Sequence, residues 1–184
     1  MRRFVPVSAT LAPVALIGGW TWAATRQPAA YDATRDTISA LAAIGAQDRW
    51  IMTAGLVVLG GAHVVTAVGL TEARPAGRVV LALGGLTAIG VAIAAQPSPA
   101  HFPVATASFV ALTVWPALSG LPTPKVAWAA SGVLAALMVW FGLELDGPRV
   151  GLAERVVAGA QALWPLGVVG VLAARGRRRA SEVA

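Results

Sequence analysis

Six apolar runs, each close to twenty residues long, constrain this chain more than any other feature. They cover about residues 5–24, 49–70, 77–95, 102–121, 126–145 and 152–174. A helix of roughly 20 apolar residues crosses the hydrocarbon core of a bilayer. Only 12% of the 184 residues are charged, about half the fraction found in soluble domains. The sequence therefore predicts an all-α integral membrane bundle of six transmembrane helices, in a single domain that spans residues 1–184.

The first run follows Arg2 and Arg3, as the apolar part of a signal peptide would. It is longer than a typical signal-peptide core, and no clean small-x-small cleavage motif follows it. We therefore expect this run to remain in the protein as the first span.

Lysine and arginine are divided unequally between the two sides that six spans define. Nine lie with the termini and the loops after the second and fourth runs, and five lie with the other loops. The nine are Arg2, Arg3, Arg74, Arg78, Lys125, Arg175, Arg177, Arg178 and Arg179. Positive residues are retained in the cytoplasm, so we expect both termini to be cytoplasmic, in a multi-pass protein of the cytoplasmic membrane with a basic tail at residues 175–184. The net charge of +6 reflects this bias, and we expect no nucleic-acid partner.

The longest connection, YDATRDTISALAAIGAQDRW at residues 31–50, is unusually rich in charge. Asp32 can cap a helix, because its carboxylate can accept the free amide protons of a first turn. At 3.6 residues per turn, one face then carries Asp32, Arg35, Asp36 and Ser39. The pattern predicts a short amphipathic helix within residues 31–46. Two interpretations stay open: a solvated helix on the outer surface, or a lid whose acids point at a site.

Polar residues recur on one face of the three runs that enter from this outer side. The second run carries Arg49, Thr53, Gly60 and His63, the fourth His101, Ala105, Ser108, Leu112 and Trp115, and the sixth Glu154, Ala158, Gln161 and Pro165. Polar side chains are costly against lipid, so we expect these faces to point into the bundle. Together they predict an outward-facing polar cavity, with Arg49, His101, Glu154 and Arg155 near its mouth.

Five residues are candidates for binding a ligand in that cavity: Arg49, Arg155, Gln161, Asp32 and Arg35. Structural alternatives stay open for them. Arg49 and Arg155 can anchor helix ends at the interface, and Gln161 can form a hydrogen bond with a neighbouring helix. His63 lies deeper, and we expect a neighbouring helix to supply its hydrogen-bond partner.

Four residues are candidates for catalysis: His101, Glu154, Asp36 and Ser39. A hydrolase needs a nucleophile, a base and an orienting acid, and these side chains supply those types on one side of the membrane. His101 would be the general base, Asp36 or Glu154 its partner, and Ser39 or a water the nucleophile. Ser39 lies in no nucleophile-elbow motif, and Glu154 can instead pair with a cation across the helix ends.

Metal and cofactor chemistry has little support. His63 lies roughly 20 Å below the start of its run, whereas His101 begins another, so the two cannot hold one haem iron. A zinc site would have to combine His101 with Asp36 and Glu154, and the chain has no cysteine. We therefore predict no metal and no cofactor.

The run at residues 31–50, HVVTAVGL at 63–70, PAH at 99–101 and GLAERVVAGAQALWP at 151–165 resemble an uncharacterised bacterial membrane family, domain of unknown function 998. The resemblance covers nearly the whole chain. It implies a six-helix bundle in the cytoplasmic membrane, and it relates residues 36–41, Arg49, His101, Glu154 and Arg155 to the family pattern. It implies no activity.

The functional prediction is a membrane protein that binds a lipid, a small amphiphile or a partner protein through the outward-facing cavity. Membrane lipids are the expected partners, and a homo-oligomer is left open. The first alternative is an intramembrane hydrolase acting on a lipid or envelope precursor from the outer side. The second is a small transporter acting as an oligomer, which needs a continuous polar path reaching His63 and Thr66.

Overall fold

The computed structural model describes residues 1–183, and within them seven helices follow one another with short connections. The helices are α1 (Val5–Ala24), α2 (Ile38–Leu41), α3 (Trp50–Gly69), α4 (Pro75–Ile93), α5 (His101–Ser119), α6 (Pro124–Leu143) and α7 (Val150–Val183). Six of them are long and apolar enough to cross a membrane. The predicted six-span bundle is confirmed. The sixth span is longer than predicted, because α7 continues as one helix through the basic tail.

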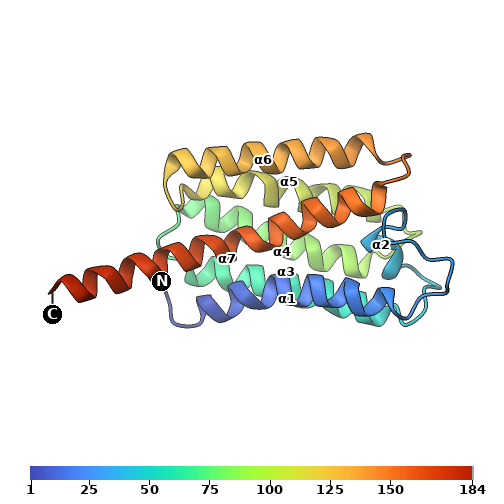
Figure 1. Ribbon diagram of the computed structural model, residues 1–184, viewed down its shortest axis with the longest axis horizontal. Coiled ribbons are helices and arrows are strands. Elements are labelled where there is room, and N and C mark those ends of the chain that lie inside the picture. Colours follow the sequence, from blue (N-terminus) through green and yellow to red (C-terminus); the bar gives the residue numbers. More distant parts are fainter. Residues whose placement is uncertain (184) are drawn as a thin grey trace.

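The long helices run antiparallel along the bundle, and both chain ends lie at the same end of it (Figure 1). We call this end, with the 70–74 and 120–123 connections, the terminal end. The opposite end, with the 25–49, 94–100 and 144–149 connections, is the α2 end. Pro75 and Pro124 each stand at the start of a helix, α4 and α6, where a missing amide proton costs nothing.

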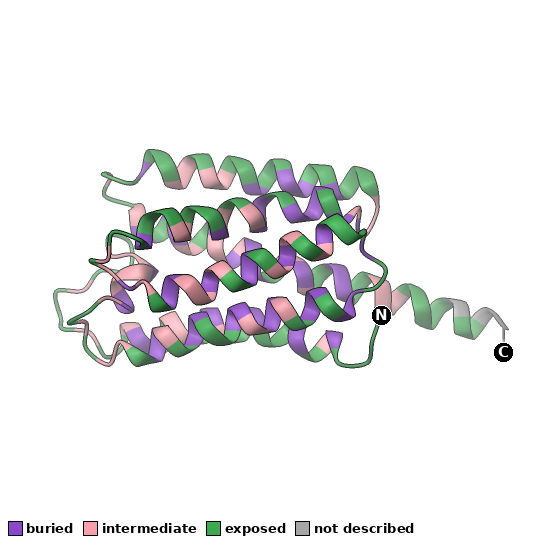
Figure 2. Ribbon diagram, turned by 180° about the vertical axis from the view of Figure 1, so that it is seen from behind, coloured by how far each residue is buried: buried purple, intermediate pink, exposed green. Residues whose placement is uncertain are grey.

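The central pair, α3 and α4, packs closely because glycines face each other. A Cβ atom on Gly60 would collide with the backbone of Gly85, and one on Gly85 would collide with Gly60. Such small residues let helix backbones approach where lipid offers no hydrophobic drive for association. Beyond this pair, α1 covers α3, α5 covers α4, and α7 lies against α1 and α6. The outermost helix, α6, is the least buried of the six (Figure 2).

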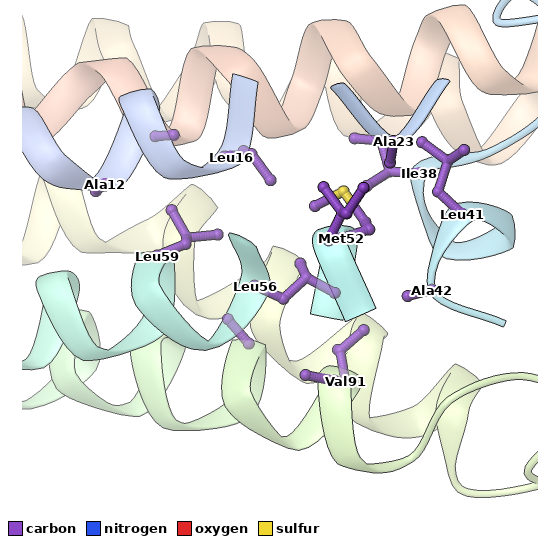
Figure 3. Close-up of a cluster of buried hydrophobic side chains, with 14 of the residues drawn as sticks. Ala12, Leu16, Ala23, Ile38, Leu41, Ala42, Met52, Leu56, Leu59 and Val91 are labelled. Atoms are coloured by element: carbon purple, nitrogen blue, oxygen red, sulfur yellow. The ribbon is translucent and has the colours of Figure 1, made fainter. Parts of the chain in front are cut away.

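The short helix α2 closes the α2 end of the bundle. Its Ile38 points toward Met52 of α3, and Leu41 belongs to the same cluster of buried apolar side chains (Figure 3). Ile38 and Leu41 are 3% and 1% exposed. The segment is therefore part of the core and not a helix lying on the surface.

This helix is shorter than predicted and begins at a different residue. Thr37 caps α2 by accepting a hydrogen bond from Ala40 N at 3.0 Å, so the prediction that Asp32 caps it is wrong. Asp32 instead accepts the amide proton of Thr34 at 2.8 Å, and its own amide donates to Asp36. These local bonds stabilise a turn that competes with the helix over residues 32–36. Gly45 then turns the chain toward α3 with φ of 97°, in the left-handed region.

Candidate functional site

Glu154, in the first turns of α7, holds α2 in place. Its carboxylate accepts the backbone amide proton of Ile38, and it accepts the Ser39 hydroxyl proton at 3.0 Å. Glu154 is only 4% exposed. An unpaired carboxylate at such a position is costly, and these two donors compensate part of that cost. None of the ion pairs in the described part of the chain involves Glu154, so the expected pairing with a cation is not observed.

Arg155, the next residue, faces the 31–36 turn instead of the bundle interior. Its guanidinium donates to the carbonyls of Ala33, Asp36 and Gly151 at 2.8, 2.7 and 2.9 Å, and to the Tyr31 hydroxyl. The turn lies so close to α7 that a Cβ on Gly151 would collide with the carbonyls of Ala33 and Asp36. Arg155 therefore connects α7 to the 31–36 turn through hydrogen bonds to backbone carbonyls.

Asp32, Arg35 and Asp36 belong to this exposed turn. The Arg35 guanidinium lies 3.7 Å from the Asp32 carboxylate, and both side chains are half or more exposed. The hydrogen bond from the Thr34 amide lowers the pKa of Asp32 below its usual value. Because the Asp36 carboxylate accepts the Asp32 amide proton, it is turned toward the loop. These groups lie apart from the interior polar residues.

A groove of about 290 Å³ lies between α5 and α6 at the α2 end. Its walls are apolar: Phe102, Phe109, Met138, Phe141 and Leu145. Phe102 and Leu145 are 65% and 46% exposed, so the groove opens onto the outside of the bundle. The rings of Phe109 and Phe141 meet across it, with centroids 5.4 Å apart. One end of the groove is polar and consists of Thr37, Ser39, Gln96, His101 and Glu154.

His101 reaches this polar end as the first residue of α5, and its hydrogen bond fixes its tautomer. Its Nδ1 lies 2.9 Å from the carbonyl oxygen of Ala94. A carbonyl only accepts, so Nδ1 carries the proton and Nε2 of the neutral ring is an acceptor. Ser39 already donates to Glu154 and can only accept a further bond. The polar end therefore presents acceptors from three side chains: His101, Ser39 and Glu154.

Behind the groove lies a smaller inner cavity of about 60 Å³, enclosed by α1, α3, α4, α5 and α7. Ser39 and Glu154 line both the groove and the cavity, so the two spaces adjoin. The three polar faces predicted from the sequence do converge here. They contribute His63 from α3, Ala105, Ser108 and Leu112 from α5, and Glu154, Ala158 and Gln161 from α7.

The polar residues deep in the bundle differ in whether they have hydrogen-bond partners. Gln161 donates from its amide nitrogen to Phe109 O and to Thr113 Oγ1 of α5, both at 2.9 Å. It thus makes the interhelix hydrogen bond that the sequence left open. The expectation for His63 is wrong: it is fully buried, and neither ring nitrogen has a partner among the described residues. Thr66, one turn below, bonds to Ser8 of α1 instead, at 2.8 Å.

Of the four catalytic candidates, the structure brings three to the groove. Ser39 and Glu154 are hydrogen-bonded, and His101 lines the same polar end. In the described residues no hydrogen bond joins His101 to Ser39, Glu154 or Asp36, so Ser39 lacks a histidine base. Over residues 1–183, no group of three or more His, Asp or Glu side chains could hold a metal ion.

A protein-family model supplies the classification. The model described as "Protein of unknown function (DUF998)" matches residues 10–172, which is most of the chain. The chain belongs to this family. A comparison with curated proteins found no match, and neither did one with solved structures. The resemblance seen in the sequence is therefore confirmed, and it describes a multi-pass membrane protein without assigning an activity.

Some of the groove was not evident in the sequence of this family member. Phe109, Met138 and Phe141 are ordinary apolar residues of spanning helices, and only the packing of α5 against α6 brings them together. Arg49 was expected at the cavity mouth, yet it lines neither the groove nor the inner cavity.

Proposed function

We propose that this protein binds a membrane amphiphile, with the hydrocarbon chain in the groove between α5 and α6 and the polar group at Ser39, His101 and Glu154. One observation carries the proposal: an apolar groove open to the surroundings ends at a buried carboxylate that forms no ion pair with any residue the structure describes. Small-molecule sites commonly combine apolar walls with a few polar groups that fix orientation.

The polar end favours a head group that donates hydrogen bonds. It presents acceptors from His101, Ser39 and Glu154, while the nearby guanidinium of Arg155 is occupied by loop carbonyls. A primary ammonium matches these acceptors in charge and in hydrogen bonding, and an anionic head group is repelled by the carboxylate. The expected ligand is therefore an amine-bearing amphiphile.

Binding is favoured over catalysis and transport by two features of the site. Ser39 donates to Glu154 and has no imidazole to take its proton, as a serine nucleophile requires. The inner cavity ends at His63, below which the buried side chains of Leu81, Trp115 and Val168 close the bundle. A transporter needs a path continuing to the terminal end.

The positive-inside bias supports one orientation of the proposed site in the membrane. With nine of the fourteen Lys and Arg residues at the terminal end, both termini would lie in the cytoplasm, and the groove would face the outer leaflet of the cytoplasmic membrane.

Photo-crosslinking tests the proposal with the full chain in lipid nanodiscs. Phosphatidylethanolamine and phosphatidylglycerol, each with a diazirine in the acyl chain, serve as the probes, and mass spectrometry maps the adducts. We expect the amine lipid to label Phe109, Met138 or Phe141 in preference to the anionic one. Glu154→Gln should lower that labelling about tenfold, since a charge-assisted hydrogen bond is lost.

Two glycines of α6 provide a matched control. A Cβ at either Gly142 or Gly132 meets no atom within 4 Å, so both positions tolerate a side chain, but only Gly142 lines the groove. Gly142→Leu should abolish labelling, and Gly132→Leu should leave it unchanged. Equal labelling in both variants, or no preference between the lipids, would overturn the proposal.

A further inference from the structure

His63 is the most unusual polar group of the membrane interior. It has no exposed surface, and neither ring nitrogen has a hydrogen-bond partner among the described residues. A buried polar group without a partner is costly, and those that persist in folded proteins usually contact water or a ligand. The His63 ring lies at the wall of the inner cavity, so the cavity is where such a partner would sit.

The cavity is large enough for several water molecules. Its volume is about 60 Å³. One water needs roughly 10–15 Å³ measured in this way, so about four fit. Its lining is polar at intervals, through Glu154, Ser39, Ser108, Gln161 and His63. Polar partners of this kind favour bound water, whereas a purely apolar cavity stays dry.

The polar groups descend from the α2 end in steps. Counted from the first residue of each helix at about 1.5 Å per residue, Glu154 lies about 6 Å down, Ser108 about 10 Å, Gln161 about 16 Å and His63 about 20 Å. Two hydrogen bonds through one water span about 5.5 Å, which matches these axial steps. The path stops at His63, because the buried side chains of Leu81, Trp115 and Val168 fill the bundle on the side of the terminal end.

We propose that the inner cavity is a hydrated proton site in which bound water connects Glu154 to His63, so that His63 accepts protons from the α2 end alone. Glu154 and His63 are the ionisable side chains among its lining residues; α1, α2, α4 and α5 contribute apolar side chains and serine hydroxyls. A proton that arrives from the α2 end first protonates the Glu154 carboxylate. Glu154 then gives a proton to the first water, and the last water gives one to a ring nitrogen of His63. The products are a carboxylate and an imidazolium, with the water restored.

The inner cavity shares Ser39 and Glu154 with the amphiphile site, but His63 lines the cavity and not the groove, so a readout at its ring reports on the cavity. The experiment uses the full chain in lipid nanodiscs with ¹⁵N-labelled histidine, since the chain has only two histidines. The His63 resonance is assigned by its loss in His63→Gln. We expect magnetisation transfer from water to the His63 ring, rapid loss of its N–H signal in D₂O, and an imidazolium ¹⁵N shift on acidification.

Plugging variants test the path. Ala158 lies one turn below Glu154 and lines the cavity, so Ala158→Leu should prolong the His63 N–H signal in D₂O about tenfold or more. Ala162→Leu, one turn below Ala158 and lining the cavity but not the groove, provides a second plug if the first does not fold. Ala160→Leu is the matched control on α7, outside the cavity lining, and should leave the exchange unchanged.

Three results would overturn the proposal. A His63 ring with no water contact in the unmodified protein would show that the cavity is dry. Unchanged exchange in both plugged variants would show that water reaches His63 by another route. A ring that contacts water but stays neutral on acidification would exclude the proton-accepting role. None of these results bears on lipid labelling in the groove.

Discussion

At the residue scale, the adjacent residues Glu154 and Arg155 of α7 stabilise different parts of the α2 end. Glu154 points inward and accepts from Ile38 and Ser39, whereas Arg155 points outward and donates to the carbonyls of the 31–36 turn. Neighbours on a helix are separated by about 100°, so one residue faces the bundle and the next faces its rim. Their opposite charges are therefore used on different partners and not on each other.

Tyr31 reports on this contact, because it is the only tyrosine in the chain. Burial of its ring raises the pKa of the phenol above the usual 10.0, an effect that outweighs the opposing influence of Arg155. We expect absorbance at 295 nm to give a titration midpoint above that of the denatured chain. Because the pKa of Tyr31 is higher in the folded than in the unfolded chain, the protonated phenol favours the folded state. Its contribution to the free energy of unfolding is complete below pH 10 and is lost as the pH rises through the folded-state pKa. A midpoint at or below the denatured value would show that burial of the ring does not outweigh the influence of Arg155.

At the element scale, α2 is too short to be stable alone, since isolated helices of fewer than about 12 residues are marginal in water. Its four residues depend on the Thr37 cap, on the buried Ile38 and Leu41, and on Glu154 (Figure 3). The helix α2 thus lines both the groove and the inner cavity, and one side chain of α7 binds it there.

Removing the Glu154 carboxylate should release α2 from this position. Glu154→Leu leaves the Ile38 amide and the Ser39 hydroxyl without an acceptor, at about 1–3 kcal/mol for a buried group, which is roughly tenfold or more in the opening equilibrium. The natural chain has no cysteine, so Ala42→Cys adds a single probe at a position that is 2% exposed. Maleimide labelling of that cysteine should accelerate by about the same factor.

Glu144→Leu in the same background is the control. Glu144 is also buried at the α2 end, but its carboxylate pairs with the Arg149 guanidinium at 3.2 Å and accepts the Arg149 amide proton. Its loss should leave the labelling rate unchanged, and a similar acceleration in both variants would mean that the whole α2 end loosens instead of α2 alone.

At the scale of the whole molecule, six spans bring the two chain ends to the same end of the bundle (Figure 1). The excess of positively charged residues lies there as well. One of them, Arg78, donates hydrogen bonds to two of the last carbonyls of α3, those of Ala67 and Val68, both at 2.8 Å. Arg78 therefore contributes to the termination of α3.

The proposed orientation predicts which loops are accessible outside the cell. Ala30→Cys at the α2 end and Thr71→Cys at the terminal end place one exposed cysteine on each side. A membrane-impermeant maleimide applied to intact cells should label the first variant and not the second, and both should react after permeabilisation. The reverse pattern would place the termini outside.

The amino-acid sequence alone determined the six spans, because bilayer thickness sets a length that each apolar run matches. It also determined the polar faces that meet at the inner cavity, since helical periodicity and the cost of polar groups in lipid leave them one direction to point. It located Ser39, His101 and Glu154 at one end of the bundle, but not their hydrogen bonds.

Only the tertiary structure decided how the polar groups are paired, because pairing depends on the rotation and offset of helices distant in sequence. Glu154 meets the amide of Ile38 across 116 positions, and Arg155 meets loop carbonyls that no side-chain pattern reveals. The same rotation leaves His63 without a partner and joins Phe109 to Phe141 in the groove. Periodicity gives the face on which a residue lies, and packing alone gives the atom that it contacts.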